Sequence, residues 1–536
     1  MLFVGLLLIA HASATRPPPG YSTTFNVKRQ ALPGALPQHP PVLPSRGAVA
    51  TGKWRNMFVE MGIDEASVVR RVDAIFDQLF AGNADERLLY EASDGSGAYI
   101  LSVDSNDVRS EGMSYGMMIA AQRDNMTMFE ALWRWAKTHM RHNAIDDARH
   151  GYFAWHCSPT GKQLDANPAS DGETWFAAAL YTAAARWNRP DYATEAAALL
   201  QDATNKTGRV QSVTAMFNSA TGVASAPAQV VFVPYAHSAT YTDPSYHLPA
   251  FYALWARHAP ANTTAQRPRS YAALNTTCQH AKSITGALSV SSVGECEVRC
   301  DNEPRCVAID TDGSTCYLKS HCEGAAGSCP NKMCGYRQAT GPPTPPSPPT
   351  PPRPPGPTPP SPSPSVHFWT AFVHSSRNYF ELTFDPYTSL SPDYSSFDGQ
   401  PTGGQHMHFA FDAWRVSQNV AMDYAWFATD ERPVGFCTRL HSFFHKANAS
   451  APYGNQFDVS TGRQLSADHS PGLVAMNAVC ALASNQSIAW GFVAELWATP
   501  TPTGKYRYYD GMLYMLGWLQ LAGQFRYYEA NATLRS

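Results

Sequence analysis

The stretch Ser110-Glu111-Gly112-Met113-Ser114-Tyr115-Gly116-Met117-Met118 sets one carboxylate at the start of an apolar segment rich in small and sulfur-bearing residues. A Glu in a first helical turn often does no more than interact with the helix dipole. The small residues around Glu111 would also leave space for a ligand, and apolar neighbours would raise the pKa of its carboxyl group, as a general acid requires. Glu111 is therefore a candidate for one half of an acid/base pair.

Two further carboxylates stand in comparable settings. Asp171 precedes a strongly helical segment and is either the N-cap of that helix or a functional group. Asp412 lies in the aromatic run Phe411-Asp412-Ala413-Trp414-Arg415-Val416, with a cation three positions further on. A buried Asp at this position is either paired with Arg415 or chemically active. The residues alone leave both alternatives open for each carboxylate.

Length and charge limit the class of protein. A chain of 536 residues is expected to form two to four units, and its net charge of −3 with dispersed Lys and Arg is not typical of a nucleic-acid binder. The apolar run at 2–10 followed by Ala12-Ser13-Ala14 predicts a signal peptide and hence secretion, with a cell-wall location as one option. No later apolar stretch reaches the roughly 20 residues of a membrane-spanning helix, so no membrane partner is expected.

The distribution of cysteines also favours an oxidising compartment. Eight of the eleven cysteines lie between Cys278 and Cys334, which is typical of a disulfide framework. A zinc site is the alternative, but paired Cys-x-x-Cys ligands are missing from the sequence. Asn-x-Ser/Thr sites, which agree with glycosylation in a secretory pathway, occur at Asn125, Asn205, Asn262, Asn275, Asn448, Asn485 and Asn531.

Helical periodicity dominates on both sides of this cysteine-rich segment. Apolar residues recur at helical spacing from Asp64, a predicted N-cap, and again in later segments, whereas alternating strand patterns are few. The simplest architecture is one helical domain interrupted by a disulfide module and a stiff polyproline II linker. The predicted parts are a signal peptide at 1–14, a Pro-rich lead-in at 15–45, a first helical part at 46–262, the disulfide module at 276–337, the linker at 341–365 and a second helical part at 366–530.

Five motifs resemble glycoside hydrolase family 8 and occur in that family's order. They are the segment from Asp107 to Met118, Gly151-Tyr152-Phe153-Ala154-Trp155, Pro168-Ala169-Ser170-Asp171-Gly172-Glu173, Asp243-Pro244-Ser245-Tyr246-His247-Leu248-Pro249 and the run from Phe411 to Val416. The likeness covers both helical parts and is greatest to the reducing-end xylose-releasing exo-oligoxylanases. It implies a mainly α fold, an (α/α)6 barrel, and hydrolysis of β-1,4 glycosidic bonds with inversion.

The resemblance also implies roles for particular residues. Glu111 matches the general acid, Asp412 the general base that activates water, and Asp171 the acid that holds a distorted sugar. Tyr246 matches a tyrosine that positions the attacking water. Further substrate-binding positions are expected at Trp155, Arg415, Tyr508 and Tyr509. No cofactor or metal is expected, because the histidines show no tight ligand motif.

The insert and one loop leave the partner and the substrate open. Cys296-Glu297-Val298-Arg299-Cys300 and the cysteines that follow resemble a PAN/apple module, a fold that binds proteins or carbohydrates. In the exo-acting relatives a Leu-His-Pro loop walls off the far subsite, whereas the matching stretch here reads Ala467-Asp468-His469-Ser470-Pro471. The cleft is therefore either blocked for exo action on xylo-oligosaccharides or open to endo attack on xylan. The alternatives are a β-1,4-glucanase of the cellulase type and a non-catalytic glycan-binding wall glycoprotein.

Overall fold

A computed structural model of the chain describes residues 34–204, 206, 212–217, 228–259, 364–449 and 451–528, together with short segments between 271 and 338. The predicted signal peptide, most of the lead-in and nearly all of the Pro-rich linker lie outside these described residues, as do the glycosylation sites at Asn205, Asn262, Asn275 and Asn531. Chain contacts divide the protein into two units, one from Met1–Ala259 with Ser361–Ser536 and one from Pro260–Pro360.

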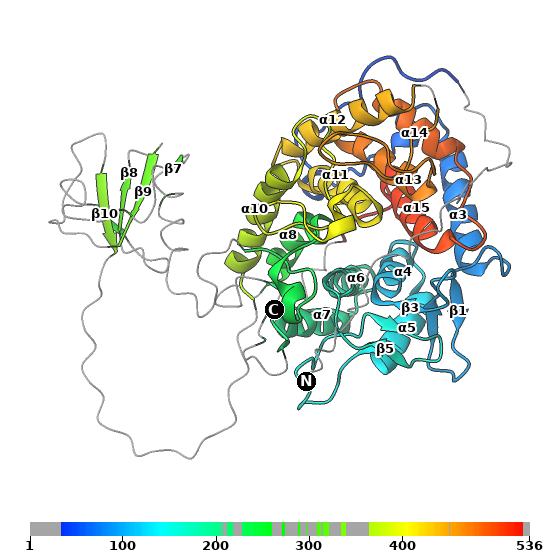
Figure 1. Cartoon of the computed structure of the whole chain (residues 1–536), viewed down its shortest axis with the longest axis horizontal. Coiled ribbons are helices and arrows are strands. Elements are labelled where there is room, and N and C mark those ends of the chain that lie inside the picture. The colour runs from blue at the N-terminus through cyan, green and yellow to red at the C-terminus, as the bar shows by residue number, and fades with distance from the viewer. Residues whose placement is uncertain are drawn as a thin grey trace, which may run out of the picture. The chain divides into compact units, whose positions relative to one another are not determined.

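Inner and outer helices alternate along the described part of the first unit and form a ring, as Figure 1 shows. The inner helices are α4 (Ser110–Gln122), α6 (Ser170–Trp187), α8 (Pro249–His258), α11 (Arg415–Phe427), α13 (Pro471–Val479) and α15 (Arg507–Leu521). The outer helices are α3 (Glu65–Ala81), α5 (Met126–Trp135), α7 (Pro190–Thr204), α10 (Val366–Thr383), α12 (Arg432–Ala447) and α14 (Ala489–Ala498). The arrangement is the predicted (α/α)6 barrel.

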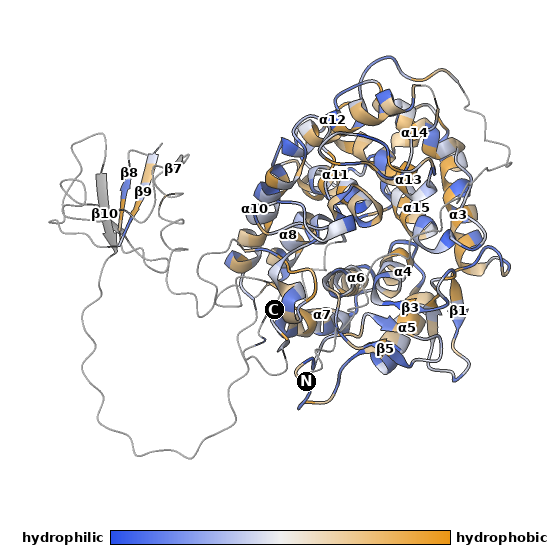
Figure 2. Ribbon diagram, in the orientation of Figure 1, coloured by the Kyte–Doolittle hydropathy of each residue, from blue (hydrophilic) through white to orange (hydrophobic). Residues whose placement is uncertain are grey.

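Burial follows the position of each helix in the ring. In the inner helix α15 every residue is buried, as expected of a helix that is surrounded by other elements on all sides. The outer helix α3 buries one face through Val68, Val72, Ile75 and Leu79, which confirms its predicted periodicity. The colouring in Figure 2 shows the same contrast, with hydrophilic residues on the outward faces of the outer helices. Asp64 caps α3 as predicted, since its side chain accepts a hydrogen bond from the Ser67 amide at 2.8 Å.

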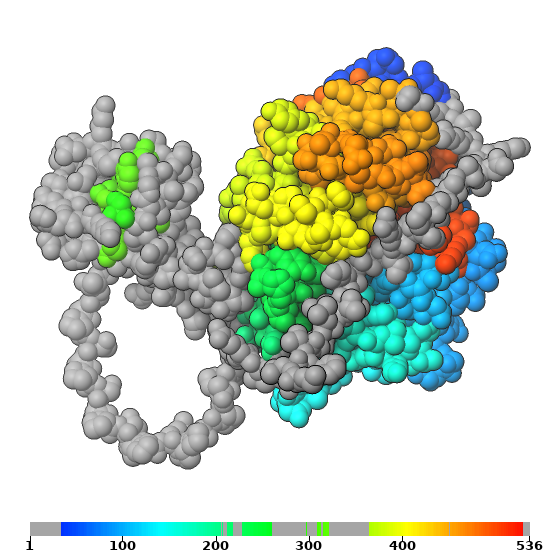
Figure 3. Space-filling view, in the orientation of Figure 1, coloured from blue at the N-terminus to red at the C-terminus, as the bar shows by residue number. Residues whose placement is uncertain are grey.

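The two parts of the chain that flank the insert form one ring. α15 packs against α4, which packs against α6, while α8, α11, α13 and α15 follow one another around the other side. The Trp175 and Phe251 rings, 4.9 Å apart, join α6 to α8. In the space-filling view, green residues of the first part adjoin yellow residues of the second part on one face (Figure 3). Residues far apart in sequence thus meet at the ends of the inner helices.

Short elements connect the helices and direct the inner ones. They are α1 (Ala48–Thr51), α2 (Met57–Glu60), β1 (Leu89–Glu91), β2 (Ala98–Ile100), β3 (Val108–Arg109), the π-helix η1 (Ala136–Met140), β4 (His156–Cys157), β5 (Gln163–Asp165), and the 3-10 helices η4 (Ala236–Thr240), η5 (Pro244–Tyr246), η6 (Gly404–Met407), η7 (Phe411–Trp414) and η8 (Cys480–Ala483). β3 pairs antiparallel with β4 and leads directly into α4. This pairing fixes where the inner helix carrying Glu111 begins.

The described part of the second unit contains an antiparallel sheet with the strand order β6-β10-β8-β9-β7. Its strands are β6 (Tyr271–Ala273), β7 (Leu288–Ser289), β8 (Ala308–Thr311), β9 (Thr315–Lys319) and β10 (Cys334–Gln338). A disulfide joins Cys296 to Cys316, inside the cysteine-rich segment where an internal framework was expected. The PAN/apple assignment stays a prediction, because it concerns residues that are largely outside the described ones.

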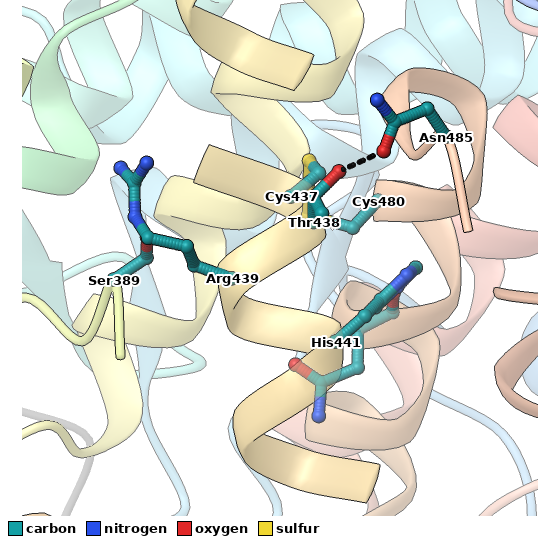
Figure 4. The surroundings of a disulfide bond; sticks show 8 residues. Ser389, Cys437, Thr438, Arg439, His441, Cys480 and Asn485 are labelled. Carbon is teal, nitrogen blue, oxygen red and sulfur yellow. Dashed lines mark hydrogen bonds between the residues drawn. A yellow bond between two sulfur atoms is a disulfide. The ribbon is translucent and has the colours of Figure 1, made fainter. Parts of the chain in front are cut away.

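A second disulfide lies in the barrel, between cysteines that sequence reasoning left unassigned. Cys437 of α12 bonds to Cys480 at the start of η8 (Figure 4). Beside it, the Thr438 hydroxyl donates a hydrogen bond to the Asn485 side-chain oxygen at 2.9 Å. Cys157 is buried and carries a free thiol. The bond ties an outer helix to the segment that follows the inner helix α13.

Candidate active site

The predicted site residues converge at the N-terminal ends of the inner helices. Glu111 and Asp171 lie in the first turns of α4 and α6. Asp412 lies in η7 immediately before α11, whose first residue is Arg415. The remaining predicted residues at this end are Tyr246 in η5, and Tyr508 and Tyr509 in the first turn of α15. Because helix N-termini carry partial positive charge, this end of the ring favours carboxylates.

Arg415 connects the carboxyl groups. Its Nη1 donates to Glu111 Oε2 at 2.7 Å, to the Tyr115 hydroxyl at 2.8 Å and to Asp171 Oδ2 at 3.1 Å. Its Nη2 lies 3.0 Å from Asp412 Oδ1. The pairing of Asp412 with Arg415 therefore exists, but the guanidinium group is shared with Glu111 and Asp171. A shared cation explains how three acids occupy one buried site.

Glu111 is held by a second donor and remains the more accessible of the proposed acid/base pair. The Tyr508 hydroxyl donates to Glu111 Oε1 at 2.9 Å. A side chain at Gly112 would place its Cβ 2.7 Å from the Tyr508 ring, so glycine permits this close approach. Burial raises the pKa of Glu111 to about 7, partly offset by Arg415. A carboxyl group with this pKa holds its proton near neutral pH, as a general acid must.

Asp412 sits deeper, with a side chain only 4% exposed. Burial raises the pKa of its carboxyl group to about 7, against the opposing effect of Arg415. The Tyr509 hydroxyl donates to the Phe411 carbonyl oxygen at 2.9 Å and lies 3.4 Å from Asp412 Oδ1. Phe411 has φ +31°, a backbone conformation that L-residues rarely adopt and that tends to occur at functional sites. Tyr509 thus supports the strained turn that carries Asp412.

Two buried acids near Asp412 were missed as functional groups. Asp243 begins the motif that contains Tyr246, but no role was predicted for it, and it is fully buried. Its Oδ1 accepts a hydrogen bond from the Ser245 amide at 2.6 Å, and its Oδ2 lies 3.9 Å from Arg415 Nη2. Burial raises the pKa of Asp243 well above its ordinary value, and the charge of the neighbouring Asp412 raises it further. Asp393 accepts from the Ala413 amide at 3.2 Å and thereby holds the η7 turn. The sequence around Asp393 contains no signal of this role.

The N-cap interpretation of Asp171 is wrong. The N-cap of α6 is Ala169, and Asp171 lies inside the first turn, where its Oδ1 accepts from the Gly172 amide at 2.7 Å. Its other oxygen contacts Arg415. The Asp171 side chain turns toward Arg415 rather than toward the helix end, because a charge-assisted hydrogen bond to a buried cation is stronger than a capping bond to a backbone amide.

A small pocket opens at these residues. Its wall is formed by Arg109, Ser110, Glu111, Trp155, Ala169, Asp171 and Tyr246. Trp155 stacks on His156 with ring centroids 4.6 Å apart, and the Arg415 guanidinium lies 5.6 Å from the Tyr246 ring centroid. The pocket has a volume of about 20 Å³, which is room for about one water molecule, and its wall combines aromatic side chains with two carboxyl groups.

The shared guanidinium also limits the distance between the two proposed catalytic groups. Glu111 and Asp412 contact its two terminal nitrogens, so their nearest oxygens lie at most about 8 Å apart. Inverting glycosidases separate their two carboxyl groups by roughly 6.5–9.5 Å and retaining ones by roughly 5–5.5 Å, and both spacings are compatible with this limit. The arrangement can place one proton donor and one proton acceptor around a single glycosidic bond.

The described residues form neither a metal site nor a membrane-spanning helix. No group of three or more His, Cys, Asp or Glu side chains there is placed to hold a metal ion. Among the described helices, none is both long and apolar enough to cross a bilayer. Two of the histidines are held by polar side chains: His247 contacts Thr242 and Ser376, and His406 contacts Asp393 at 2.8 Å.

The chain belongs to family 8 of the glycosyl hydrolases. The family profile matches residues 93–281, which include Glu111, Asp171 and Tyr246. A solved family 8 structure from Teredinibacter turnerae, a complex with xylobiose, is 31% identical, covers 90% of this chain and 99% of that chain, and superposes with a TM-score of 0.64. The protein is thus a glycoside hydrolase, and the alternative of a non-catalytic wall glycoprotein is wrong.

Relatives of known activity extend over nearly the whole chain. The reducing-end xylose-releasing exo-oligoxylanase Rex8A of Paenibacillus barcinonensis is 29% identical over 500 residues, 90% of this chain and 99% of the relative. The corresponding enzyme of Halalkalibacterium halodurans is 28% identical and covers 90% of this chain. Endoglucanases match over shorter segments: the probable endoglucanase of Novacetimonas hansenii is 33% identical over 110 residues, 20% of this chain.

Proposed function

We propose that this glycoside hydrolase cleaves β-1,4 bonds of xylo-oligosaccharides or xylan with inversion at the anomeric carbon. The main structural support is the Arg415 guanidinium group, which forms ion pairs with Glu111, Asp171 and Asp412 and so joins acids from both parts of the chain. The substrate is supported by the exo-oligoxylanase relatives, which align over about nine-tenths of the chain. The endoglucanase matches are confined to about a quarter of it or less.

In the proposed mechanism Glu111 is the general acid. It lines the pocket and is 16% exposed, compared with 4% for Asp412, so its proton can reach the oxygen of a bound glycosidic bond. As that bond breaks, Asp412 accepts a proton from a water molecule, and the water oxygen attacks the anomeric carbon from the opposite face of the ring. One proton is donated and one is accepted, and the configuration inverts.

The remaining residues orient the sugar and the carboxyl groups. Asp171 faces the pocket and supplies an acceptor for a sugar hydroxyl, while Arg415 holds both catalytic carboxyl groups in position. Tyr246 lines the same pocket and is assigned to the attacking water. Trp155 offers an aromatic wall for a sugar ring. Tyr508 and Tyr509 act through Glu111 and the Asp412 turn as positioning residues.

Substitutions that keep shape but remove acidity test these roles. Glu111→Gln and Asp412→Asn should each lower kcat on xylohexaose by at least about a hundredfold, since general acid–base steps contribute about 10²–10⁴-fold each. Glu65→Gln, an exposed residue in the first turn of the outer helix α3, is the matched control and should keep full activity. NMR should detect the α-anomer as the first product from a β-linked substrate. Initial appearance of the β-anomer would exclude Asp412 as a base.

The substrate and the bond that is cut are tested together with end-labelled oligosaccharides. Reducing-end-labelled xylohexaose should release labelled xylose if the enzyme shares the exo action of its relatives, and a mixture of shorter labelled products if it cuts internally. In the loop that decides this, His469 Nδ1 lies 2.8 Å from the Tyr453 carbonyl oxygen and Nε2 lies 3.2 Å from Glu495. These two contacts hold His469 in place, although the residues on either side of it differ from the Leu and Pro of the exo-acting relatives. Turnover of cellohexaose alone would refute the xylan assignment.

Secretion and glycosylation remain predictions that accompany this function. Of the three predicted glycosylation sites among the described residues, Asn448 and Asn485 are exposed, whereas Asn125 is half-buried and its side chain accepts a hydrogen bond from the Met128 amide at 3.0 Å. The Cys437–Cys480 disulfide agrees with an oxidising compartment. Expression of the full chain in a eukaryotic host should yield secreted protein lacking residues 1–14. Peptide mapping after deglycosylation should detect modification at the exposed sites.

A further inference from the structure

A buried histidine is joined to the turn that carries the proposed general base. In the loop before η7, His406 Nδ1 lies 2.8 Å from Asp393 Oδ2, and Asp393 Oδ1 accepts a hydrogen bond from the Ala413 amide at 3.2 Å. The side chains of His406 and Asp393 are 6% and 4% exposed. Because Ala413 directly follows Asp412, one carboxyl group connects the imidazole ring to the turn of the base.

The turn is held on both sides of Asp412. Phe411, which precedes it, has φ +31°, a conformation that persists only where surrounding contacts maintain it. On that side the Tyr509 hydroxyl donates to the Phe411 carbonyl oxygen at 2.9 Å. On the other side the Ala413 amide donates to Asp393. Loss of either contact would let the Asp412 carboxyl group move, and a misplacement of about 1 Å can lower a reaction rate about a hundredfold.

His406 turns inward from an exposed loop. Its neighbours Gln405 and Met407 are exposed, whereas the His406 side chain is buried. Its ring stacks on the Tyr394 ring, with centroids 4.0 Å apart and an angle of 12° between the planes. The backbone supports the same arrangement, since the Tyr394 amide donates to the His406 carbonyl oxygen at 3.0 Å. These contacts fix the ring with Nδ1 facing Asp393.

The contact between His406 and Asp393 does more than fill space. An imidazole nitrogen beside a carboxylate carries the hydrogen of the contact, so Nδ1–H donates to Asp393 Oδ2. This charge-assisted bond fixes one oxygen of the carboxyl group and leaves the other directed at the Ala413 amide. A phenyl ring at position 406 could stack on Tyr394 in the same way, but it would remove this donor from a buried carboxyl group.

We propose that His406 is a positioning residue for the general base, which it holds in place through Asp393 and the Ala413 amide. The inference rests on the proposed role of Asp412 as that base. His406 acts on the turn before α11 and not on the sugar. Its loss should therefore lower kcat while KM stays nearly constant, because the affected contact matters in the transition state rather than in substrate binding.

Two substitutions separate the donor from the ring. His406→Asn loses the ring but keeps an N–H donor at about the position of Nδ1, so kcat on xylohexaose should stay within about threefold of the unchanged enzyme. His406→Phe keeps the ring but loses the donor, and should lower kcat at least about tenfold with KM changed less than about twofold. If His406→Phe does not fold, His406→Gln replaces it, because its amide reaches about as far as Nε2 and misses Asp393. His408→Asn, in the same loop with a side chain 39% exposed, is the matched control and should keep full activity. Equal kcat in the donor-keeping and donor-lacking variants would overturn the proposal.

A double-mutant cycle distinguishes this role from a general effect on the fold. In Asp412→Asn the base is already lost, so adding the donor-lacking change at His406 should lower the remaining rate less than about twofold. In Tyr508→Phe, which affects the acid, the same change should keep its full effect of at least about tenfold. A full effect in both backgrounds would show that His406 supports the fold as a whole, and would refute its positioning role alone. A fully active Asp412→Asn variant would instead refute the base assignment, and this inference with it.

Discussion

The hydrogen bond from Tyr508 to Glu111 makes a quantitative prediction for the pH dependence of catalysis. The Tyr508 hydroxyl donates to Oε1 at 2.9 Å, and a donor stabilises the ionised form of a carboxyl group. Tyr508→Phe removes that donor and keeps the ring that packs against Gly112. The pKa of Glu111, already raised to about 7 by burial, should therefore rise further.

The magnitude follows from the strength of such bonds. A hydrogen bond to a charged group contributes about 1.5–3 kcal/mol, and one pKa unit corresponds to 1.36 kcal/mol. Because the Glu111 side chain is 16% exposed, water replaces part of the lost interaction, and the lower end of that range applies. We expect an upward shift of about one pKa unit.

The assay is the pH profile of kcat/KM on xylohexaose. A general acid must be protonated, so activity is lost as pH rises through its pKa, and this alkaline limb should move upward by about one unit in Tyr508→Phe. Tyr509→Phe is the matched control at the next position of α15: its hydroxyl lies 3.4 Å from Asp412 and does not contact Glu111 in the described hydrogen bonds, so the alkaline limb should stay in place. A downward shift in Tyr508→Phe, or an equal shift in both variants, would refute the assignment of Glu111 as the acid.

Three further predictions concern the structure around the site. Gly112→Ala places a Cβ 2.7 Å from the Tyr508 ring and should lower kcat at least tenfold. The control is Gly491→Ala on α14, where a Cβ meets nothing within 4 Å; it should leave kcat unchanged and raise the free energy of unfolding by about 0.5–1 kcal/mol. Equal kcat in the two variants would contradict the steric explanation. Replacing Cys437 and Cys480 by Ser opens a link across 43 residues and should lower the free energy of unfolding in urea by about 4 kcal/mol, and reductant should then have no further effect. Burial raises the pKa of Glu173 to about 8, so the folded protein keeps a proton there that the unfolded chain releases, and the free energy of unfolding falls as pH rises from the ordinary Glu pKa to about 8. Glu173→Gln removes this loss and should stabilise the protein at pH 8 but not at pH 4. Identical melting curves of the two proteins at pH 8 would contradict this prediction.

Local patterns predicted the helices well, and they predicted less about how side chains meet. Apolar spacing and the Asp64 cap located α3, because both depend on neighbours within one or two turns. The sequence paired Arg415 with Asp412 alone, three positions away, because its contacts with Glu111 and Asp171 exist only after the ring closes. The Cys437–Cys480 bond escaped prediction for the same reason.

The candidate acids were recognisable only when an independent pattern accompanied them. Glu111 and Asp412 occur in motifs of small or aromatic residues, so composition and family resemblance both drew attention to them. Asp393 holds the Asp412 turn through the Ala413 amide, twenty residues away and with no distinctive neighbours. Asp393 acts through a hydrogen bond to a backbone amide, a group that almost every residue carries, so the contact leaves no recognisable pattern in the surrounding sequence.

The charge balance of the site explains how acid and base roles can differ among similar carboxyl groups. Glu111, Asp171, Asp243 and Asp412 surround one guanidinium group, so full ionisation would leave a net charge of −3 in a buried space, which is strongly unfavourable. Burial raises the pKa of Asp243 well above its ordinary value, and the neighbouring Asp412 raises it further, so a proton on Asp243 removes one negative charge from the surroundings of Asp412.

Two protons, one on Asp243 and one on Glu111, reduce that charge from −3 to −1. That residual charge suits the oxocarbenium-like transition state of glycoside hydrolysis, which develops positive charge on the sugar. Asp243→Asn would keep this balance and should preserve the acidic limb of the kcat/KM profile, whereas Arg415→Met would remove the shared cation and should raise the pKa of Glu111 and Asp412 together. A large shift of the acidic limb in Asp243→Asn would show instead that Asp243 is ionised and that the site carries one more negative charge than proposed.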